Sequence, residues 1–153
     1  SPGAMWRRVS AAPSPMTIAI VDTGAVLALA IASDPRHHDV VRAIGSHAGG
    51  LILPDPVLFE SAQLIGRRFG STAEARLIRH LVATDWRRMP VTEDDLGRVA
   101  DLLETYADAN IGLADATIVA IAERLEATRL FTLDRRDFAI IRPRHVEAFE
   151  LLP

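Results

Sequence analysis

The chain of 153 residues has 49% hydrophobic and 24% charged residues, which is typical of one globular domain and excludes disordered or fibrous protein. It contains neither cysteine nor lysine, which excludes disulfide scaffolds, thiolate zinc sites, standard P-loops and Schiff-base enzymes. All 17 basic residues are therefore arginine, and the formal charge of −3 means that nucleic acid could be bound only locally or through cations.

The first residues differ in pattern from the rest of the chain. Residues 1–15 are rich in Ala, Pro and Ser without hydrophobic periodicity, and the first four resemble a remnant of an expression vector. We therefore expect a disordered tail over 1–15 and a single folded domain over 16–153. The longest apolar run, 18–32, is interrupted by Asp22 and is too short for a membrane span of roughly 18 residues. We expect a cytoplasmic protein without membrane contact.

From residue 17 onward, short apolar runs alternate with longer stretches of helical pattern. Strands are predicted at 17–21, 51–53, 129–133 and 146–151, with a short strand or a simple connection at 86–89. Helices are predicted at 24–32, 34–46, 55–69, from 71 onward, 92–107 and 112–127. Gly70 is a typical helix stop, Ser71 with Glu74 forms a possible capping box, and Thr92 is a further candidate cap.

This alternation of strands and helices predicts how the elements pack. Strands separated by helices pair in parallel through right-handed crossovers, which predicts an α/β fold, a three-layer α/β/α sandwich with a mainly parallel central sheet. Ligands of such sheets bind beyond the carboxyl ends of the strands, where the strand order reverses. Functional side chains are therefore expected directly after the strands.

Four acidic residues occupy such positions. Asp22 follows the first strand, and Asp134 follows the strand at 129–133. Glu60 lies near the start of the helix after the second strand, and Asp115 lies in the first turn of the helix over 112–127. Converging carboxylates repel one another, and their pKa values rise unless cations neutralise them. The pattern predicts a site for Mg²⁺ or Mn²⁺, which prefer carboxylate oxygen ligands.

Each of these acids also has a purely structural interpretation. Asp22 could cap a helix, and Asp115 or Glu60 could simply favour the positive end of a helix dipole. Asp134 could be an ordinary turn residue. Individual positions leave both interpretations open, and only the combination favours a metal site.

Four stretches, in this order and spacing, resemble the PIN-domain nucleases, specifically the VapC toxins of bacterial type II toxin–antitoxin pairs. The stretches are VDTGA at 21–25, PVLFE at 56–60, GLADA at 112–116 and TLDRRDF at 132–138. The resemblance runs from about residue 18 to 153. It implies a metal-dependent endoribonuclease with Mg²⁺ or Mn²⁺ as cofactor, inhibited by a cognate antitoxin and forming a homodimer.

The family's acids map onto Asp22, Glu60, Asp115 and Asp134. In the mechanism expected for this site, Asp22 and Asp115 hold the metal ion, and the other two orient the attacking water or bind a second ion. Attack by water implies 5′-phosphate and 3′-hydroxyl ends.

Three further residues are expected to support these four acids. They are Thr23, Asp108 and Asp137. Asp137, three residues after Asp134, could share or replace the role of that aspartate.

Two arginines are candidates for contacts with RNA or with the antitoxin. Arg67 lies seven positions after Glu60, so on a continuous helix it faces within about 20° of that glutamate. Arg135 could reach a phosphate or pair with Asp137. The alternative for both arginines is an ordinary solvated surface position.

Two other functional classes remain open. A PIN-like module that binds RNA without catalysis would usually have lost one or more of the acids. An aspartate-dependent phosphatase could use Asp22 as nucleophile, but such enzymes normally need a lysine and a second aspartate two residues later, and the chain has neither.

Overall fold

Five parallel strands form the centre of the structure, a computed structural model that describes residues 18–153. The tail expected over 1–15, the expected domain start at 16 and Thr17 lie outside the described residues. The strands are β1 (Ala19–Val21), β2 (Leu51–Pro54), β3 (Arg87–Met89), β4 (Arg129–Phe131) and β5 (Glu150–Leu152). Their order is β3-β2-β1-β4-β5, and every neighbouring pair is parallel.

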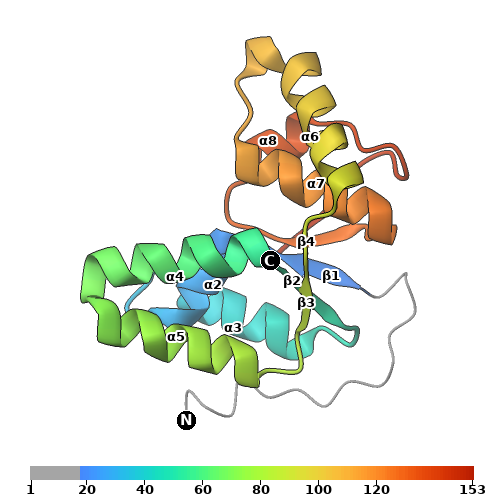
Figure 1. Cartoon of the computed structure of the whole chain (residues 1–153). Coiled ribbons are helices and arrows are strands. Elements are labelled where there is room, and N and C mark those ends of the chain that lie inside the picture. Colours follow the sequence, from blue (N-terminus) through green and yellow to red (C-terminus); the bar gives the residue numbers. More distant parts are fainter. Residues whose placement is uncertain (1–17) are drawn as a thin grey trace.

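Helices cover both faces of this sheet, which confirms the predicted three-layer sandwich (Figure 1). One layer contains α2 (Thr23–Ala30), α3 (His37–Ser46), α4 (Asp55–Phe69) and α5 (Ser71–Ala83). The other contains α6 (Glu93–Thr105), the 3-10 turn η2 (Ala107–Ala109), α7 (Leu113–Leu125) and α8 (Arg136–Ile140). Right-handed crossovers explain the two layers, because the chain steps outward from β1 to β3 and then returns to β4 in the opposite direction. The strand order therefore reverses between β1 and β4.

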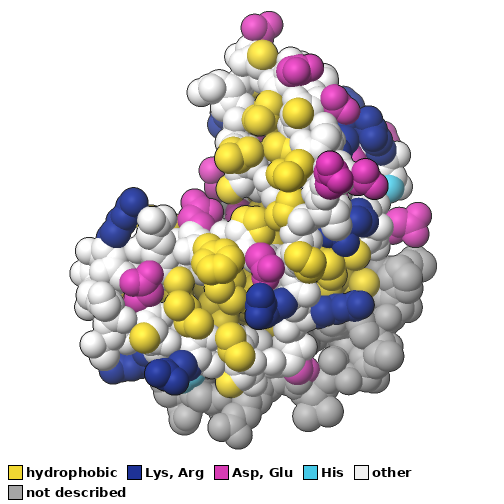
Figure 2. Space-filling view, in the orientation of Figure 1, with side chains coloured by type: hydrophobic (Ala, Val, Ile, Leu, Met, Phe, Trp, Pro, Cys, Tyr) yellow, Lys and Arg dark blue, Asp and Glu magenta, His cyan; other side chains and the backbone are white. Residues whose placement is uncertain are grey.

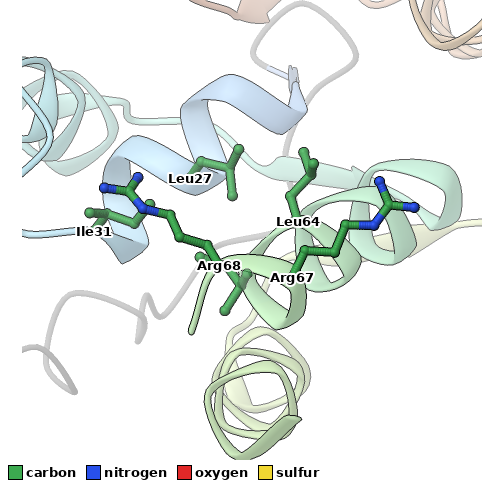
Figure 3. A pocket seen from close by; sticks show the side chains of 6 residues that line it. Leu27, Ile31, Leu64, Arg67 and Arg68 are labelled. Atoms are coloured by element: carbon green, nitrogen blue, oxygen red, sulfur yellow. The ribbon is translucent and has the colours of Figure 1, made fainter. Parts of the chain in front are cut away.

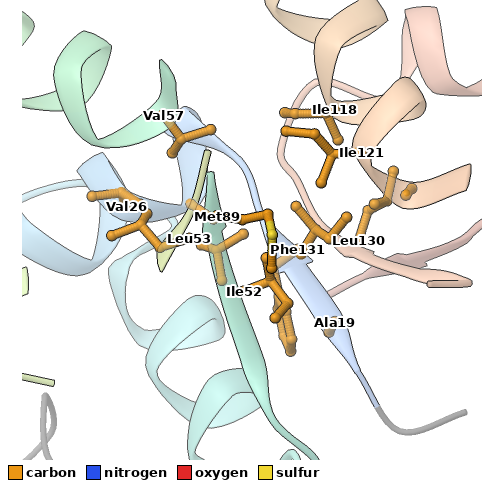
Figure 4. Close-up of a cluster of buried hydrophobic side chains, with 14 of the residues drawn as sticks. Ala19, Val26, Ile52, Leu53, Val57, Met89, Ile118, Ile121, Leu130 and Phe131 are labelled. Atoms are coloured by element: carbon orange, nitrogen blue, oxygen red, sulfur yellow. The ribbon is translucent and has the colours of Figure 1, made fainter. Parts of the chain in front are cut away.

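The core lies between the sheet and the two helical layers. Every residue of β1 and β2 is buried, as expected for parallel strands that are covered on both faces. In Figure 4, Val26 and Val57 reach the sheet from the layer of α2 and α4. Ile118 and Ile121 of α7 approach the sheet from the other layer. Within residues 18–153, none of the helices has both the length and the apolar character that crossing a bilayer requires.

Most predicted elements are found within a few residues of their expected bounds, and the helix at 55–69 is confirmed at both ends. The uncertain stretch at 86–89 contains a strand. The last strand begins at Glu150 rather than at 146. Helix α8 was not predicted, because its five residues are too few to show a periodicity.

The capping box predicted at Ser71 is wrong. Helix α5 begins at Ser71 itself, only one residue after α4 ends, which leaves no room for a serine cap. Glu74 instead packs against Gly66, where its Oε2 lies 2.3 Å from the position that a Cβ would take. The capping box of this structure is at Thr92, where the hydroxyl accepts a hydrogen bond from the Asp95 N–H and the Asp95 carboxylate accepts one from the Thr92 N–H.

The turn between α4 and α5 generates a prediction about stability. Gly70 has φ 92° and ψ 169°, a conformation that is open essentially only to glycine. We expect Gly70→Ala to lower the free energy of unfolding by about 1–3 kcal/mol, measured by urea denaturation. The reason is backbone strain and not crowding, since no heavy atom lies within 4 Å of a Cβ at this position.

Gly97 provides the matched control. It is an exposed residue inside α6, and a Cβ there also has no neighbour within 4 Å. Gly97→Ala is expected to raise the free energy of unfolding by about 0.5–1 kcal/mol, because alanine is the better helix former. A stability change of the same sign in both variants would contradict the strain at Gly70.

Candidate active site

Asp22 lies where the strand order reverses, directly after β1. Its side chain is buried, with 7% of the residue exposed. Its Oδ1 accepts a hydrogen bond of 2.7 Å from the Thr23 N–H, and its Oδ2 accepts one of 2.8 Å from the Thr132 hydroxyl. Asp22 is thus the N-cap of α2, as its structural interpretation expected, and it is also a fixed carboxylate at the predicted ligand edge.

Thr23 connects this carboxylate to the next acid. Its hydroxyl donates a hydrogen bond of 2.8 Å to Oε2 of Glu60, which lies in the second turn of α4. Glu60 is exposed, whereas Thr23 is buried. The structure therefore places Thr23 between two of the predicted acids.

Asp115 has a strongly raised pKa. It lies half-buried in the first turn of α7. Burial, followed by the interaction with Asp137 and the negative charges of Asp22 and Asp134, raises the pKa of Asp115 to about 8. Burial also raises the pKa of Asp22, against the lowering effect of its two hydrogen bonds, and the charges of Glu60 and Asp134 add to the rise. The carboxylates of Asp22, Glu60, Asp115 and Asp134 are therefore near enough for their charges to interact unfavourably.

Two aspartates with different surroundings follow β4, Asp134 in the loop and Asp137 at the start of α8. Asp134 is exposed, and its Oδ1 accepts a hydrogen bond of 3.3 Å from the Arg136 N–H. Asp137 is buried, and its two oxygens accept hydrogen bonds from the Gly112 N–H at 2.8 Å and from Arg136 Nη1 at 2.7 Å. Although burial would raise the pKa of Asp137, hydrogen bonds with the Gly112 N–H and with the Asp115 carboxyl group, together with Arg136, hold it below the usual value.

Thr132 is a site residue that the sequence analysis did not identify. It is fully buried, and its hydroxyl can donate either to Asp22 Oδ2 at 2.8 Å or to the carbonyl oxygen of Asp134 at 3.0 Å. The available signal was a polar residue at the end of an apolar strand.

Asp108 and Arg135 do not join these acids. Asp108 is exposed on η2, and within residues 18–153 no hydrogen bond or ion pair connects it to the other acids. Arg135 is exposed, and its Nη2 donates to the carbonyl oxygen of Pro153.

Arg67 lies at a pocket between α2 and α4 with a volume of about 440 Å³. The pocket is lined by Leu27, Ile31, Leu64, Ile65, Arg67 and Arg68. Figure 3 shows the Arg68 side chain reaching toward Ile31, while Arg67 extends the other way past Leu64. Arg68 also lies over the ring of Phe69, 4.9 Å from its centroid.

Exposed hydrophobic side chains stand next to the acids. Phe59, immediately before Glu60, is 66% exposed, and Leu113, two residues before Asp115, is 64% exposed. Figure 2 shows a face that is hollowed between the two groups of helices, with hydrophobic side chains along it and acidic side chains among them. The site is therefore open to a large ligand.

The donor set fits a hard divalent cation. Within residues 18–153, no three His, Cys, Asp or Glu side chains are close enough to hold an ion by themselves. Mg²⁺, however, commonly takes only one or two carboxylates and keeps several waters. Burial of the carboxylates, and then the negative charges near them, raise the pKa values of Asp22 and Asp115, and a bound cation would offset both effects. The geometry fits an open site at these two residues rather than a closed cage.

Comparisons with known proteins show which family this fold belongs to. The profile of the PIN domain matches residues 19–142. Ribonuclease VapC26 of Mycobacterium tuberculosis is 34% identical over 134 residues, which cover 88% of this chain and 99% of that protein. The crystal structure of VapC20 of Mycobacterium tuberculosis, a toxin that cleaves the sarcin-ricin loop, is similar with a TM-score of 0.74 and 25% identity, over 84% of this chain and 98% of that chain. VapBC2 of Rickettsia felis, solved with a DNA fragment from its promoter, has the same fold, with a TM-score of 0.68 and 12% identity over 89% of this chain and 99% of that chain.

The raised pKa of Asp115 generates a prediction about stability. The carboxyl group has a pKa of about 8 in the folded protein against 3.8 ordinarily, so its contribution to stability is complete below pH 3.8 and is lost as the pH rises to about 8. In metal-free protein, we expect Asp115→Asn to raise the free energy of unfolding by about 1–3 kcal/mol at pH 9, after allowance for solvent screening, and to change it little at pH 4. Urea denaturation in EDTA at both pH values measures this difference.

Asp95→Asn is the control with the opposite sign. Although burial raises it, the pKa of Asp95 is held low by hydrogen bonds from Arg124 and Thr92, so its charge stabilises the fold above the ordinary pKa. Asp95→Asn should therefore destabilise the protein at pH 9. An Asp115→Asn effect that is the same at pH 4 and pH 9 would contradict the raised pKa.

Proposed function

Because the chain belongs to the PIN-domain family, in its branch of VapC ribonucleases, we propose that it is a metal-dependent endoribonuclease toxin that a cognate antitoxin inhibits. The observation that supports this best is the gathering of Asp22, Glu60, Asp115 and Asp134 at the reversal point of the sheet. Burial and, after it, the negative charges of their neighbours raise the pKa values of Asp22 and Asp115, and this is an environment that a divalent cation stabilises.

In this proposal, Asp22 and Asp115 hold Mg²⁺ or Mn²⁺. Hydrogen bonds from the Thr23 N–H and the Thr132 hydroxyl fix the carboxylate of Asp22 without neutralising its charge. A divalent ion held there supplies polarisation of the scissile phosphate and a lower pKa for water.

Glu60 and Asp134 act on the attacking water. Both are exposed carboxylates, and Thr23 holds one oxygen of Glu60. They orient the water and accept its proton while its oxygen attacks phosphorus in line. The bond from phosphorus to the 3′ oxygen breaks, and that oxygen takes up a proton, so the ends are 5′-phosphate and 3′-hydroxyl. The 2′-hydroxyl takes no part.

The pocket between α2 and α4 is suited to the antitoxin. Most of its lining is apolar, from Leu27, Ile31, Leu64 and Ile65, which favours side chains of a protein over a phosphate backbone. Arg68 at its side could pair with an acidic residue of the partner. The homodimer that the resemblance implies stays a prediction.

Replacing the two proposed metal ligands tests the function directly. We expect Asp22→Asn and Asp115→Asn each to reduce metal-dependent RNA cleavage by about 100-fold or more while the fold stays intact. Purified protein is incubated with ribosomal, transfer or messenger RNA in Mg²⁺, Mn²⁺ or EDTA, and the cut ends are sequenced. Asp39→Asn, an exposed aspartate on α3, is the matched control and should cleave like the wild type.

The same assay separates the rival classes. A small phosphomonoester is included beside the RNA, and its hydrolysis without RNA cleavage would identify a phosphatase. Binding of RNA without cleavage under any metal condition would identify a non-catalytic module. Near wild-type cleavage by either ligand variant would refute the roles of Asp22 and Asp115.

Arg67 is proposed to contact RNA along the same face of α4 as Glu60. The helix is continuous over Asp55–Phe69, so Arg67 lies about 10 Å beyond Glu60 along the axis, at a distance suited to a phosphate further along the strand. Arg67 is exposed, and no carboxylate within the described part of the chain forms an ion pair with it.

Salt dependence measures this contact. We expect Arg67→Ala to weaken RNA binding and to reduce the slope of log K against log salt by about 1, because one phosphate contact is lost. Binding is measured on an Asp22→Asn background to prevent cleavage. Arg76→Ala, an exposed arginine on α5, is the control with an unchanged slope. An unchanged slope for Arg67→Ala would show that this arginine does not contact phosphate.

A further inference from the structure

Two neighbouring side chains at the start of α8 fasten the connection between α6 and α7 to that helix. Oδ2 of Asp137 accepts a hydrogen bond of 2.8 Å from the Gly112 N–H, and Oδ1 accepts one of 2.7 Å from Nη1 of Arg136. Nη2 of Arg136 donates a hydrogen bond of 2.7 Å to the carbonyl oxygen of Ala109. Two of these hydrogen bonds tie residues 109–112 to residues 136 and 137, and the third joins Arg136 to Asp137.

These contacts distinguish Asp137 from Asp134. Both oxygens of Asp137 accept strong donors, and only 6% of the residue is exposed. Asp134 is exposed, and one backbone N–H at 3.3 Å contacts its carboxylate. The carboxylate of Asp134 is therefore available to bind water, whereas both oxygens of Asp137 already accept hydrogen bonds from the protein.

The fastened segment leads directly into the turn that carries Asp115. Gly112 is the N-cap residue of α7, and its N–H, which has no partner within the helix, donates to Asp137 of another element. Oδ2 of Asp137 and Oδ2 of Asp115 lie 3.6 and 3.9 Å from the position that a Cβ of Gly112 would take. Asp137 is thus in contact with the helix start and also with the proposed ligand itself, because the carboxyl groups of Asp115 and Asp137 are hydrogen-bonded to each other.

The irregular backbone of the connection explains why fastening matters. The stretch includes η2 and Asn110, which has a left-handed conformation with φ 51°. Such a segment has no continuous helical or sheet hydrogen bonding to fix its course. Without an outside attachment, the first turn of α7 could shift relative to β1, and Asp115 would shift relative to Asp22.

We propose that Arg136 and Asp137 form a latch that sets the position of Asp115 relative to Asp22, and that they are positioning residues of the ribonuclease. The proposal rests on the proposed function. It divides the roles that the sequence left open between two aspartates, with Asp134 acting on the water and Asp137 acting through Gly112. Groups that orient metal ligands in this way typically change affinity or activity by about 10- to 100-fold when removed.

The test compares Asp137→Asn and Arg136→Ala with wild type by three measurements. We expect kcat for RNA to fall about 10- to 100-fold with KM nearly unchanged, and the affinity for Mn²⁺, titrated without RNA, to fall about 10-fold or more. In metal-free protein, the NMR signal of the Gly112 amide proton should move upfield in both variants. Asp137→Asn removes the charge of the acceptor, and Arg136→Ala removes the group that holds the acceptor in place. Arg136→Lys should recover part of the lost kcat, because it restores a cation beside Asp137.

Asp95→Asn is the matched control. It disrupts another buried contact between a carboxylate and an arginine, at the opposite end of α7, where Arg124 donates to Asp95 at 2.9 Å. It should lower stability while kcat, Mn²⁺ affinity and the Gly112 signal stay at their wild-type values. The Arg136 side chain is 59% exposed, so Arg136→Ala is expected to fold even if Asp137→Asn does not.

Folded variants with wild-type kcat and Mn²⁺ affinity would overturn the latch, whether or not the Gly112 signal moves. A wild-type chain that cleaves no RNA in any metal would instead refute the proposed function. In that case the Mn²⁺ titration and the Gly112 signal still decide whether the latch positions Asp115.

Discussion

Burial of carboxylates that folding brings together, with the repulsion between them, is the constraint on which the rest of the site depends. Asp22 is fixed at the end of a fully buried strand, and Asp115 arrives on a helix from the other side of the reversal point. Each unit by which their pKa values rise corresponds to about 1.4 kcal/mol that favours the protonated form in the folded chain. The apolar core between the sheet and both helical layers must offset this. The metal-free fold therefore carries electrostatic strain at its functional edge, and a cation relieves it.

The positions of the arginines leave the negative charge of Asp22 available to a metal ion. In the scaffold, arginines neutralise buried acids: Arg98 contacts Glu123 at 2.8 Å and, against the effect of burial, holds its pKa low. At the site, the donors to Asp22 are instead a backbone N–H and a threonine hydroxyl. Neutral donors fix the geometry of a carboxylate without cancelling its charge. The absence of lysine from the sequence has the same effect, since no lysine ammonium group competes with a metal ion for the oxygens of Asp22.

The sequence predicts the layers, the parallel sheet and the positions of the acids, because these follow from long periodic patterns and from which residues end the strands. It does not predict the parts that tertiary contacts decide. Helix α8 is too short for periodicity, and Ser71 looks like a cap until the single residue between α4 and α5 is known. Thr132 resembles any threonine of a strand, and its role depends on Asp22, 110 residues away along the chain. Local patterns therefore identify the ligands, whereas the groups that orient them become visible only in three dimensions.

The topology explains why orientation is a separate problem in this fold. The connection from β3 to β4 passes over β2 and β1 and is the longest between consecutive strands of the described chain, and Asp115 lies at the start of its last helix. The segment just before that helix is irregular backbone, and a helix start that depends on such backbone alone would be poorly fixed. The loop after β4 starts beside β1, because β4 pairs with β1 in the sheet. This loop carries Asp134, and the start of α8 that follows it contacts Gly112 and Ala109. The short stretch from the end of β4 to the start of α8 thus fixes the position of Asp115 relative to the strand that carries Asp22. The geometry of the proposed metal-binding edge is therefore set by the sheet and not by the crossover.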